Sequence, residues 1–151
     1  MWTQKDYWKV DKDEFKKKWI DGKNPYKTFR YLIEDAIRLR LRADVEIGSC
    51  LSGGLDSSLI VGICKQKYGI KMHTFSSVYE DKECNEKEYI DAVNEMNGTI
   101  PHIIYPEPKD KDIIEYFRQI VMHHDGPNGS ASLYSQYSVM EGAKPYVKVL
   151  L

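Results

Sequence analysis

The chain has 151 residues, of which 22 are lysine or arginine and 23 are aspartate or glutamate, so its formal net charge is −1. This balance argues against a nucleic-acid-binding protein, because such proteins usually carry a basic face. No apolar run approaches the roughly 18 residues of a membrane span. Three scattered cysteines without a CxxC pair argue against a disulfide framework and a zinc site. No signal peptide is visible, and we expect a cytoplasmic protein.

The N-terminal residues differ in composition from the rest of the chain. Residues 1–23 are polar, rich in lysine and aspartate, and contain several aromatic residues. This pattern favours a linker or N-terminal arm, with one short amphipathic turn over 15–20. The pattern changes at residue 24, and we expect a domain over 24–151.

The first helix of this domain is predicted from apolar residues that recur at helical spacing between Phe29 and Leu41. Asn24 is suited to cap it and Pro25 to begin it. The predicted elements that follow are a strand over 45–51, a helix over 56–68, a strand over 72–78, a helix over 85–97, a strand over 102–105, a helix over 109–123, a loop over 124–130, a helix over 131–143 and an apolar strand over 146–151.

Two features of these elements define the predicted fold. Gly69 and Gly98 follow helices at the position where a left-handed residue often ends them. The helix over 85–97 is predicted to bury a stripe made of Tyr89, Val93 and Met96. Because strands alternate with helices, we expect right-handed crossovers and a parallel sheet. The predicted fold class is α/β, with three layers and helices on both faces of the sheet.

The most informative segment is SGGLDSS, residues 52–58, where an apolar strand turns directly into a helix. Such a turn presents free backbone N–H groups and the positive end of a helix dipole, which attract an anion. Gly53 and Gly54 permit positive φ and let an anion approach the backbone. Asp56 would repel a phosphate unless a divalent cation lay between them, and Mg²⁺ is the usual solution.

The segment lacks the lysine of the G-x-x-x-x-G-K-[ST] phosphate loop. That lysine serves transfer of the γ-phosphoryl group. A loop of backbone donors, hydroxyls and Mg²⁺ would instead hold the β- and γ-phosphates as one unit. It suits attack at the α-phosphate, because charge then develops on the departing pyrophosphate.

SGGLDSS at a strand–helix turn resembles the pyrophosphate loop of the N-type ATP pyrophosphatases. The flanking segments 38–51 (RLRLRADVEIGSCL) and 125–139 (DGPNGSASLYSQYSV) are similar to those of glutamine-hydrolysing asparagine synthetases, as are 75–79 and 85–89. The resemblance extends over nearly the whole chain from about residue 7. It implies an adenine nucleotide alpha hydrolase-like, Rossmann-like domain that is incomplete.

The resemblance also implies roles for individual residues. Pyrophosphate of ATP would be bound by Ser52, Gly53, Gly54, Leu55, Asp56, Ser57 and Ser58, with Asp56 as the Mg²⁺ ligand. Adenosine would lie between the ends of the first two strands, with Cys50 and Leu51 on one side and Ser77 and Val78 on the other. The β-carboxylate of aspartate would attack the α-phosphate to give β-aspartyl-AMP, which ammonia converts to asparagine.

Three departures from this family limit what the chain is expected to do. The glutaminase domain is missing, since Trp2 follows Met1 where the family has its nucleophilic cysteine. The sequence ends at Leu151, before the family's glycine-rich acidic loop. Gly126 replaces the middle residue of an Asp-Glu-Pro or Asp-Gln-Pro segment. We therefore expect a C-terminally truncated synthetase domain with little or no activity alone and no confident catalytic residue, unless another chain or a glutaminase subunit completes it.

Other interpretations remain open from the sequence. The chain could adenylate a different acceptor, as β-lactam-forming or tRNA-modifying relatives do, or serve as a nucleotide-binding or regulatory module without activity. His123 and His124 beside Asp125 suggest a metal site, but adjacent histidines on a helix point to different faces, which disfavours joint ligation. Cys64 is predicted to be a core residue, and Cys84 an exposed loop residue.

Overall fold

A computed structural model describes residues 2–79, 86–106, 113–126 and 132–151. The chain divides into two compact units, Met1–Leu39 and Arg40–Leu151. Within the described ranges, no helix combines the length and the apolar character of a membrane span. Some sequence predictions fall outside the described residues: that for Cys84, that for most of the loop over 124–130, and those for the starts of the helices expected over 85–97, 109–123 and 131–143.

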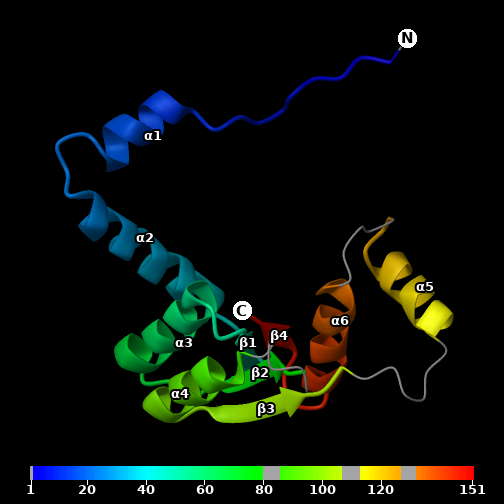
Figure 1. Cartoon of the computed structure of the whole chain (residues 1–151). Helices are drawn as coiled ribbons and strands as arrows, with labels where there is room; N and C mark the ends of the chain where they lie inside the picture. The colour runs from blue at the N-terminus through cyan, green and yellow to red at the C-terminus, as the bar shows by residue number, and fades with distance from the viewer. Residues whose placement is uncertain (1, 80–85, 107–112, 127–131) are drawn as a thin grey trace. The chain divides into compact units, whose positions relative to one another are not determined.

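The first unit contains two helices whose N-termini are capped by side chains (Figure 1). Helix α1, Lys12–Trp19, begins after Asp11, whose carboxylate accepts hydrogen bonds of 3.0 and 2.9 Å from the backbone two and three residues later. Helix α2, Pro25–Arg40, begins after Asn24, whose side-chain oxygen accepts equivalent bonds of 3.0 and 3.3 Å. These bonds satisfy N–H groups that have no acceptor within a helix. The predicted cap at Asn24 is confirmed.

The second unit is built on a four-stranded parallel sheet with the strand order β3-β2-β1-β4. Its elements in chain order are β1 (Ile47–Cys50), α3 (Leu55–Tyr68), β2 (His73–Ser77), α4 (Lys87–Asn97), β3 (Ile100–Ile104), α5 (Ile113–His123), α6 (Ser132–Ala143) and β4 (Val149–Leu150). Gly69 and Gly98 end α3 and α4 in the left-handed conformation, as predicted.

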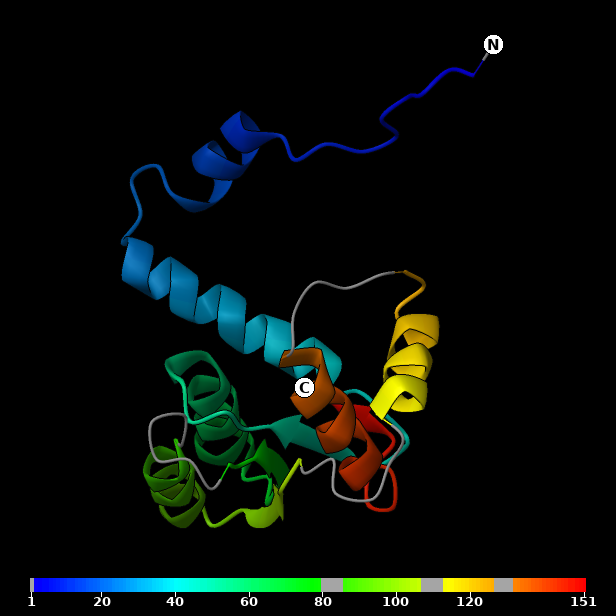
Figure 2. The same ribbon diagram turned by 45° about the vertical axis from the view of Figure 1, so that its right-hand side comes forward.

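Helices lie on both faces of this sheet (Figures 1 and 2). Successive side chains of a strand point to opposite faces. In β2, Phe75 packs with Val139 and Ala143 of α6, whereas the hydroxyl of Thr74 donates a hydrogen bond of 2.7 Å to Asn94 of α4. Helix α4, which packs beside α3, therefore covers the face opposite to α6. The predicted α/β fold class, a parallel sheet between two helical layers, is confirmed.

The buried face of α4 differs from the prediction. Tyr89 is 63% exposed and Met96 is 77% exposed, so two of the three members of the predicted stripe face solvent. The helix instead buries Ile90, Asn94 and Asn97. Hydrophobic periodicity missed this face because two of its three residues are polar. The side-chain oxygen of Asn94 accepts hydrogen bonds from two threonine hydroxyls, whereas its Nδ2 is buried without a partner among the described residues.

Candidate functional site

The SGGLDSS loop leaves β1 at the place where the strand order reverses. The chain runs from β1 through β2 to β3 in one direction, and β4 then pairs with the other side of β1. In open parallel sheets, such a reversal leaves a crevice outside the carboxyl ends of the strands, because the connecting helices lie on opposite faces. The loop that follows Cys50 is at this end of β1, so the fold provides a ligand-binding position there.

Several backbone N–H groups of the loop have no helix carbonyl as their hydrogen-bond acceptor. Gly53 has a φ of +87°, a conformation that favours glycine. Gly54 is the N-cap of α3, and no side chain makes a capping hydrogen bond from that position. The N–H groups of the first turn, residues 55–57, therefore have no acceptor within the helix. Together with the positive end of the α3 dipole, they form a position that attracts an anion.

The serine hydroxyls of the loop are engaged with one another and with the backbone. The Ser57 hydroxyl accepts a hydrogen bond of 3.2 Å from the Ser52 N–H and lies 3.1 Å from the Ser52 hydroxyl. The Ser58 hydroxyl donates a bond of 2.7 Å to the Gly54 carbonyl. These bonds hold the two ends of the loop together, so the backbone N–H groups are its most accessible donors for an anion.

Asp56 lies in the first turn of α3 and is exposed. Among the described residues, none forms an ion pair or side-chain hydrogen bond with its carboxylate, which therefore remains available to a cation. A carboxylate suits Mg²⁺, which keeps several waters and is commonly held by one or two carboxylates together with phosphate oxygens. The described residues form no group of three or more metal-ligating side chains. A single carboxylate such as that of Asp56 fits a cation that is also held by the phosphates of a nucleotide.

The four residues predicted to contact adenosine occupy two kinds of position. The side chains of Leu51 and Val78 are 1% and 3% exposed and belong to the core between the sheet and α3–α4. Their N–H groups donate bonds of 2.9 Å to the carbonyls of Phe75 and Ile104. Only the remaining backbone atoms of these two residues could reach a ligand.

Cys50 and Ser77, by contrast, are half-buried. Cys50 packs against the core on the α6 side of the sheet. Burial raises the pKa of the Cys50 thiol, so the side chain is neutral at pH 7 and offers an apolar, uncharged surface. Such a surface suits an aromatic base better than a phosphate.

Sequence reasoning missed the residues that pack against the loop from α4. A Cβ added at Gly53 would lie 3.2 Å from the Cβ and from the carbonyl oxygen of Glu86, and 3.3 Å from Cγ1 of Ile90. Glu86 is the N-cap of α4. The only signal in the sequence that could have found this contact is the glycine itself, because Glu86 and Ile90 lie more than thirty positions away.

A histidine pair on β2 and β3 lies among aromatic rings. Nδ1 of His73 lies 2.8 Å from Nε2 of His102, a hydrogen bond that requires one ring to donate and the other to accept. The His102 ring also lies 4.7 Å from the Phe75 ring and 4.0 Å from the Tyr146 ring, between centroids. Burial and the neighbouring His73 lower the pKa of His102. This pair is separate from the loop.

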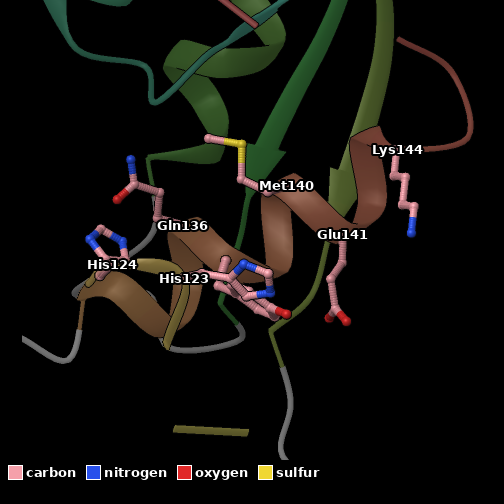
Figure 3. Close-up of a pocket in the computed structure, with 7 residues that line it drawn as sticks. His123, His124, Gln136, Met140, Glu141 and Lys144 are labelled. Atoms are coloured by element: carbon pink, nitrogen blue, oxygen red, sulfur yellow. The ribbon is translucent and has the colours of Figure 1, made fainter. Parts of the chain in front are cut away.

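A hollow of about 530 Å³ lies along α5 and α6, and no loop residue lines it (Figure 3). Its lining residues are His123, His124, Gln136, Tyr137, Met140, Glu141 and Lys144. The ring of His123 lies 5.8 Å from that of Tyr137, between centroids. These histidines belong to no group of three or more metal-ligating side chains among the described residues. Most of the lining side chains are exposed, which makes the hollow shallow.

Comparison with known proteins identifies the family. Residues 28–151 match the model of the asparagine synthase family. The chain is 36% identical over 133 residues to a Methanocaldococcus jannaschii protein whose name describes it as a glutamine-hydrolyzing asparagine synthetase, covering 87% of this chain and 25% of the relative. It is 33% identical to asparagine synthetase 1 of Bacillus subtilis, covering 99% of this chain and 23% of the relative. The chain thus spans about a quarter of the length of these relatives. It belongs to the asparagine synthase family.

Proposed function

We propose that this chain is the ATP-binding part of an asparagine synthetase domain. The observation that carries the proposal is the loop at the reversal of strand order, which combines first-turn N–H groups without helical acceptors and the exposed carboxylate of Asp56. Membership of the family adds the expectation of ATP-dependent amide formation. Because the chain covers only part of its relatives, the activity, the substrates and the partners are all part of this proposal.

The proposed reaction has two steps. An oxygen of the aspartate β-carboxylate forms a bond to the α-phosphorus of ATP, the bond to the bridging oxygen breaks, and pyrophosphate leaves. Ammonia then attacks the acyl carbon of β-aspartyl-AMP, AMP leaves, and the nitrogen loses a proton to give asparagine. The first step concentrates negative charge on pyrophosphate, so donors fixed around the β- and γ-phosphates would stabilise its transition state.

Each part of the site has a proposed task in this scheme. The backbone N–H groups of residues 55–57 donate to the phosphates, and the α3 dipole favours their charge. Bound Mg²⁺ would neutralise part of the triphosphate charge, and Asp56 is the residue that would hold it. Cys50, Leu51, Ser77 and Val78 border the adenosine, the two core residues through backbone atoms only. The hydroxyls of Ser52 and Ser57 would donate to a phosphate after the hydrogen bonds that they make with each other and with the Gly54 carbonyl open.

The proposal is tested by nucleotide binding to Asp56→Asn. This change keeps the shape of the side chain but removes the charge that a cation needs. We expect the variant to bind Mg-ATP more weakly, by roughly tenfold if one charge-assisted contact of about 1.4 kcal/mol is lost. In the presence of a chelator, the parent and the variant should bind ATP alike, or the variant more tightly. Isothermal titration calorimetry measures both conditions.

Asp44→Asn is a matched control, because Asp44 is also exposed but precedes β1 and therefore lies at the opposite edge of the sheet. It should bind Mg-ATP as the parent does. If Asp56→Asn bound Mg-ATP with the parent's affinity, the assignment of the loop would be wrong.

The cellular setting is also proposed from the family. We propose a cytoplasmic location, and a second chain or a glutaminase subunit as the partner that supplies ammonia. Co-purification with such a partner, followed by an asparagine-forming assay on the complex, would test this. ATP binding without AMP formation, even with the partner present, would favour a regulatory module instead.

A further inference from the structure

We propose that Ile90, together with the backbone of Glu86, positions the phosphate-binding loop, so that the affinity for ATP depends on how α4 packs against Gly53. This inference rests on the proposed function, because it assigns the loop to phosphate. It makes Ile90 a positioning residue, since its side chain lies in the core and acts through the loop rather than on the ligand.

The contact that carries the proposal is between Gly53 and the first turn of α4. A side chain at Gly53 would meet the Cβ and carbonyl oxygen of Glu86 and the Cγ1 of Ile90, each within 3.2 to 3.3 Å of its Cβ. That carbonyl is itself fixed, because it accepts hydrogen bonds of 3.0 and 3.1 Å from the N–H groups of Tyr89 and Ile90. The loop therefore rests against a rigid helical turn rather than against a flexible side chain.

Ile90 connects this contact to both strand ends that border the site. It is 1% exposed and packs in one cluster with Leu51, Val61 and Val78. Leu51 is the residue directly before the loop, Val61 lies on α3, and Val78 follows β2. The Ile90 side chain thus lies where a Cβ at Gly53 would meet it, and it belongs to the same core as the residues before, after and beside the loop.

Glycine makes this support necessary. With no Cβ, Gly53 can adopt many backbone conformations, of which a φ of +87° is only one. Packing against Ile90 and Glu86 selects the conformation seen here. If the packing is lost, the fraction of molecules with a competent loop falls, and the apparent dissociation constant rises in inverse proportion to that fraction.

The test compares two substitutions at one position. Ile90→Ala removes the Cγ1 atom that faces Gly53, whereas Ile90→Val retains a carbon there. At a temperature where both variants are folded, we expect Ile90→Ala to raise the dissociation constants of Mg-ATP and of Mg-pyrophosphate by the same factor, roughly tenfold if the competent fraction falls to about a tenth. Adenosine affinity should not change, because the phosphate position alone is affected. Ile90→Val should bind all three as the parent does.

Val139→Ala controls for a general loss of stability, because Val139 is buried in the core on the opposite face. It should lower the melting temperature without changing pyrophosphate affinity. Amide hydrogen exchange without ligand provides a separate readout: the N–H groups of Ser52 and Gly54, which donate to serine hydroxyls of the loop, should exchange faster in Ile90→Ala than in Val139→Ala. Unchanged loop exchange in Ile90→Ala, or equal acceleration in the control, would overturn the positioning role. A parent chain that bound neither ATP nor pyrophosphate would instead overturn the proposed function, while the exchange experiment would still decide the role of Ile90.

Discussion

At the scale of single residues, the hydroxyls of Ser52 and Ser57 show what ligand binding must change. They lie 3.1 Å apart, and the Ser57 hydroxyl also donates a hydrogen bond of 3.2 Å to the Gly54 carbonyl. Each could donate to a phosphate only after its present hydrogen bond opens. A neutral hydrogen bond contributes about 1 kcal/mol net, whereas a bond to a charged acceptor is roughly twice as strong. Replacing these neutral hydrogen bonds by hydrogen bonds to a phosphate is therefore favourable, so the loop can rearrange at little cost in free energy.

Gly53 carries two constraints that a binding experiment cannot separate. The sequence suggests glycine because phosphate must approach the backbone, and the structure adds a positive φ and close contact with Glu86 and Ile90. Gly53→Ala would therefore strain the fold as well as disturb the loop. For this reason Asp56 and Ile90 are better positions for testing the site, because neither substitution places a side chain on a residue with positive φ.

The pair of His73 and His102 predicts how the stability of the chain depends on pH. The pKa of His102 is lowered from its ordinary 6.5, mainly by burial and also by repulsion from His73. The folded chain then binds fewer protons than the unfolded chain near that pH. Stability is fully present above the unfolded pKa and declines as the pH falls through it. We expect the melting temperature of the parent to fall between about pH 7.5 and about pH 5.5.

His102→Gln removes this titration while retaining a hydrogen-bonding side chain beside His73. Its melting temperature should depend less on pH over the same interval than that of the parent. His124→Gln, at an exposed position just after α5, serves as the control and should behave as the parent does. The same pH dependence in His102→Gln and the parent would contradict the prediction.

At the scale of elements, α4 is attached to the sheet by a buried polar contact as well as by Ile90. The side-chain oxygen of Asn94 accepts hydrogen bonds of 2.7 Å from the Thr74 hydroxyl and 2.6 Å from the Thr99 hydroxyl. Thr74 is 0% exposed, so its hydroxyl has no access to water. The contact joins β2, α4 and the start of β3, and fixes α4 along the sheet.

Asn94→Leu should consequently destabilise the second unit. The change removes the 2.7 Å acceptor of the buried Thr74 hydroxyl and leaves it only a 3.5 Å contact with the Thr99 hydroxyl, at a cost of up to about 3 kcal/mol. Urea-induced unfolding, followed by circular dichroism, measures the loss. The double variant Asn94→Leu with Thr74→Val removes both partners and should recover part of it. Glu95→Ala, at the neighbouring exposed position, should change the stability by less than about 0.5 kcal/mol. An Asn94→Leu variant as stable as the parent would show that the contact contributes nothing.

The same helix shows what the sequence could and could not predict. Strand and helix positions follow from apolar runs, Asn24 and the glycines after α3 and α4, because these are local signals. The predicted stripe of α4 was wrong because the helix buries Asn94 and Asn97 instead. The side-chain oxygen of Asn94 accepts hydrogen bonds from Thr74 and Thr99, outside the helix, whereas Asn97 donates to the Val93 carbonyl within it. Hydrophobic periodicity carries no information about such partners. Boundaries of the short strands also shifted, since pairing rather than composition determines where each strand ends.

At the scale of the whole molecule, the site is predictable only in part. SGGLDSS and its position between a strand and a helix indicate the anion position directly. The reversal of strand order at β1 could not be read from the sequence, because it depends on which side of β1 the last strand pairs. The support from Glu86 and Ile90 was equally hidden, since it depends on packing between α4 and the loop. The sequence therefore predicts which residues would donate to an anion, and the fold shows which residues pack against them.

The final prediction concerns how far the reaction proceeds on this chain. In the proposed function, binding of ATP requires the loop and the ends of β1 and β2, all of which the chain contains. Adenylation further requires aspartate to be held with its carboxylate about 3–3.5 Å from the α-phosphorus, and the proposed function assigns no residue of this chain to that task. We expect the chain to bind ATP but to catalyse little or no exchange of labelled pyrophosphate into ATP in the presence of aspartate. Asparagine synthetase 1 of Bacillus subtilis, of which this chain matches 23%, is the positive control. Robust exchange by the 151-residue chain alone would show that the aspartate site lies within it.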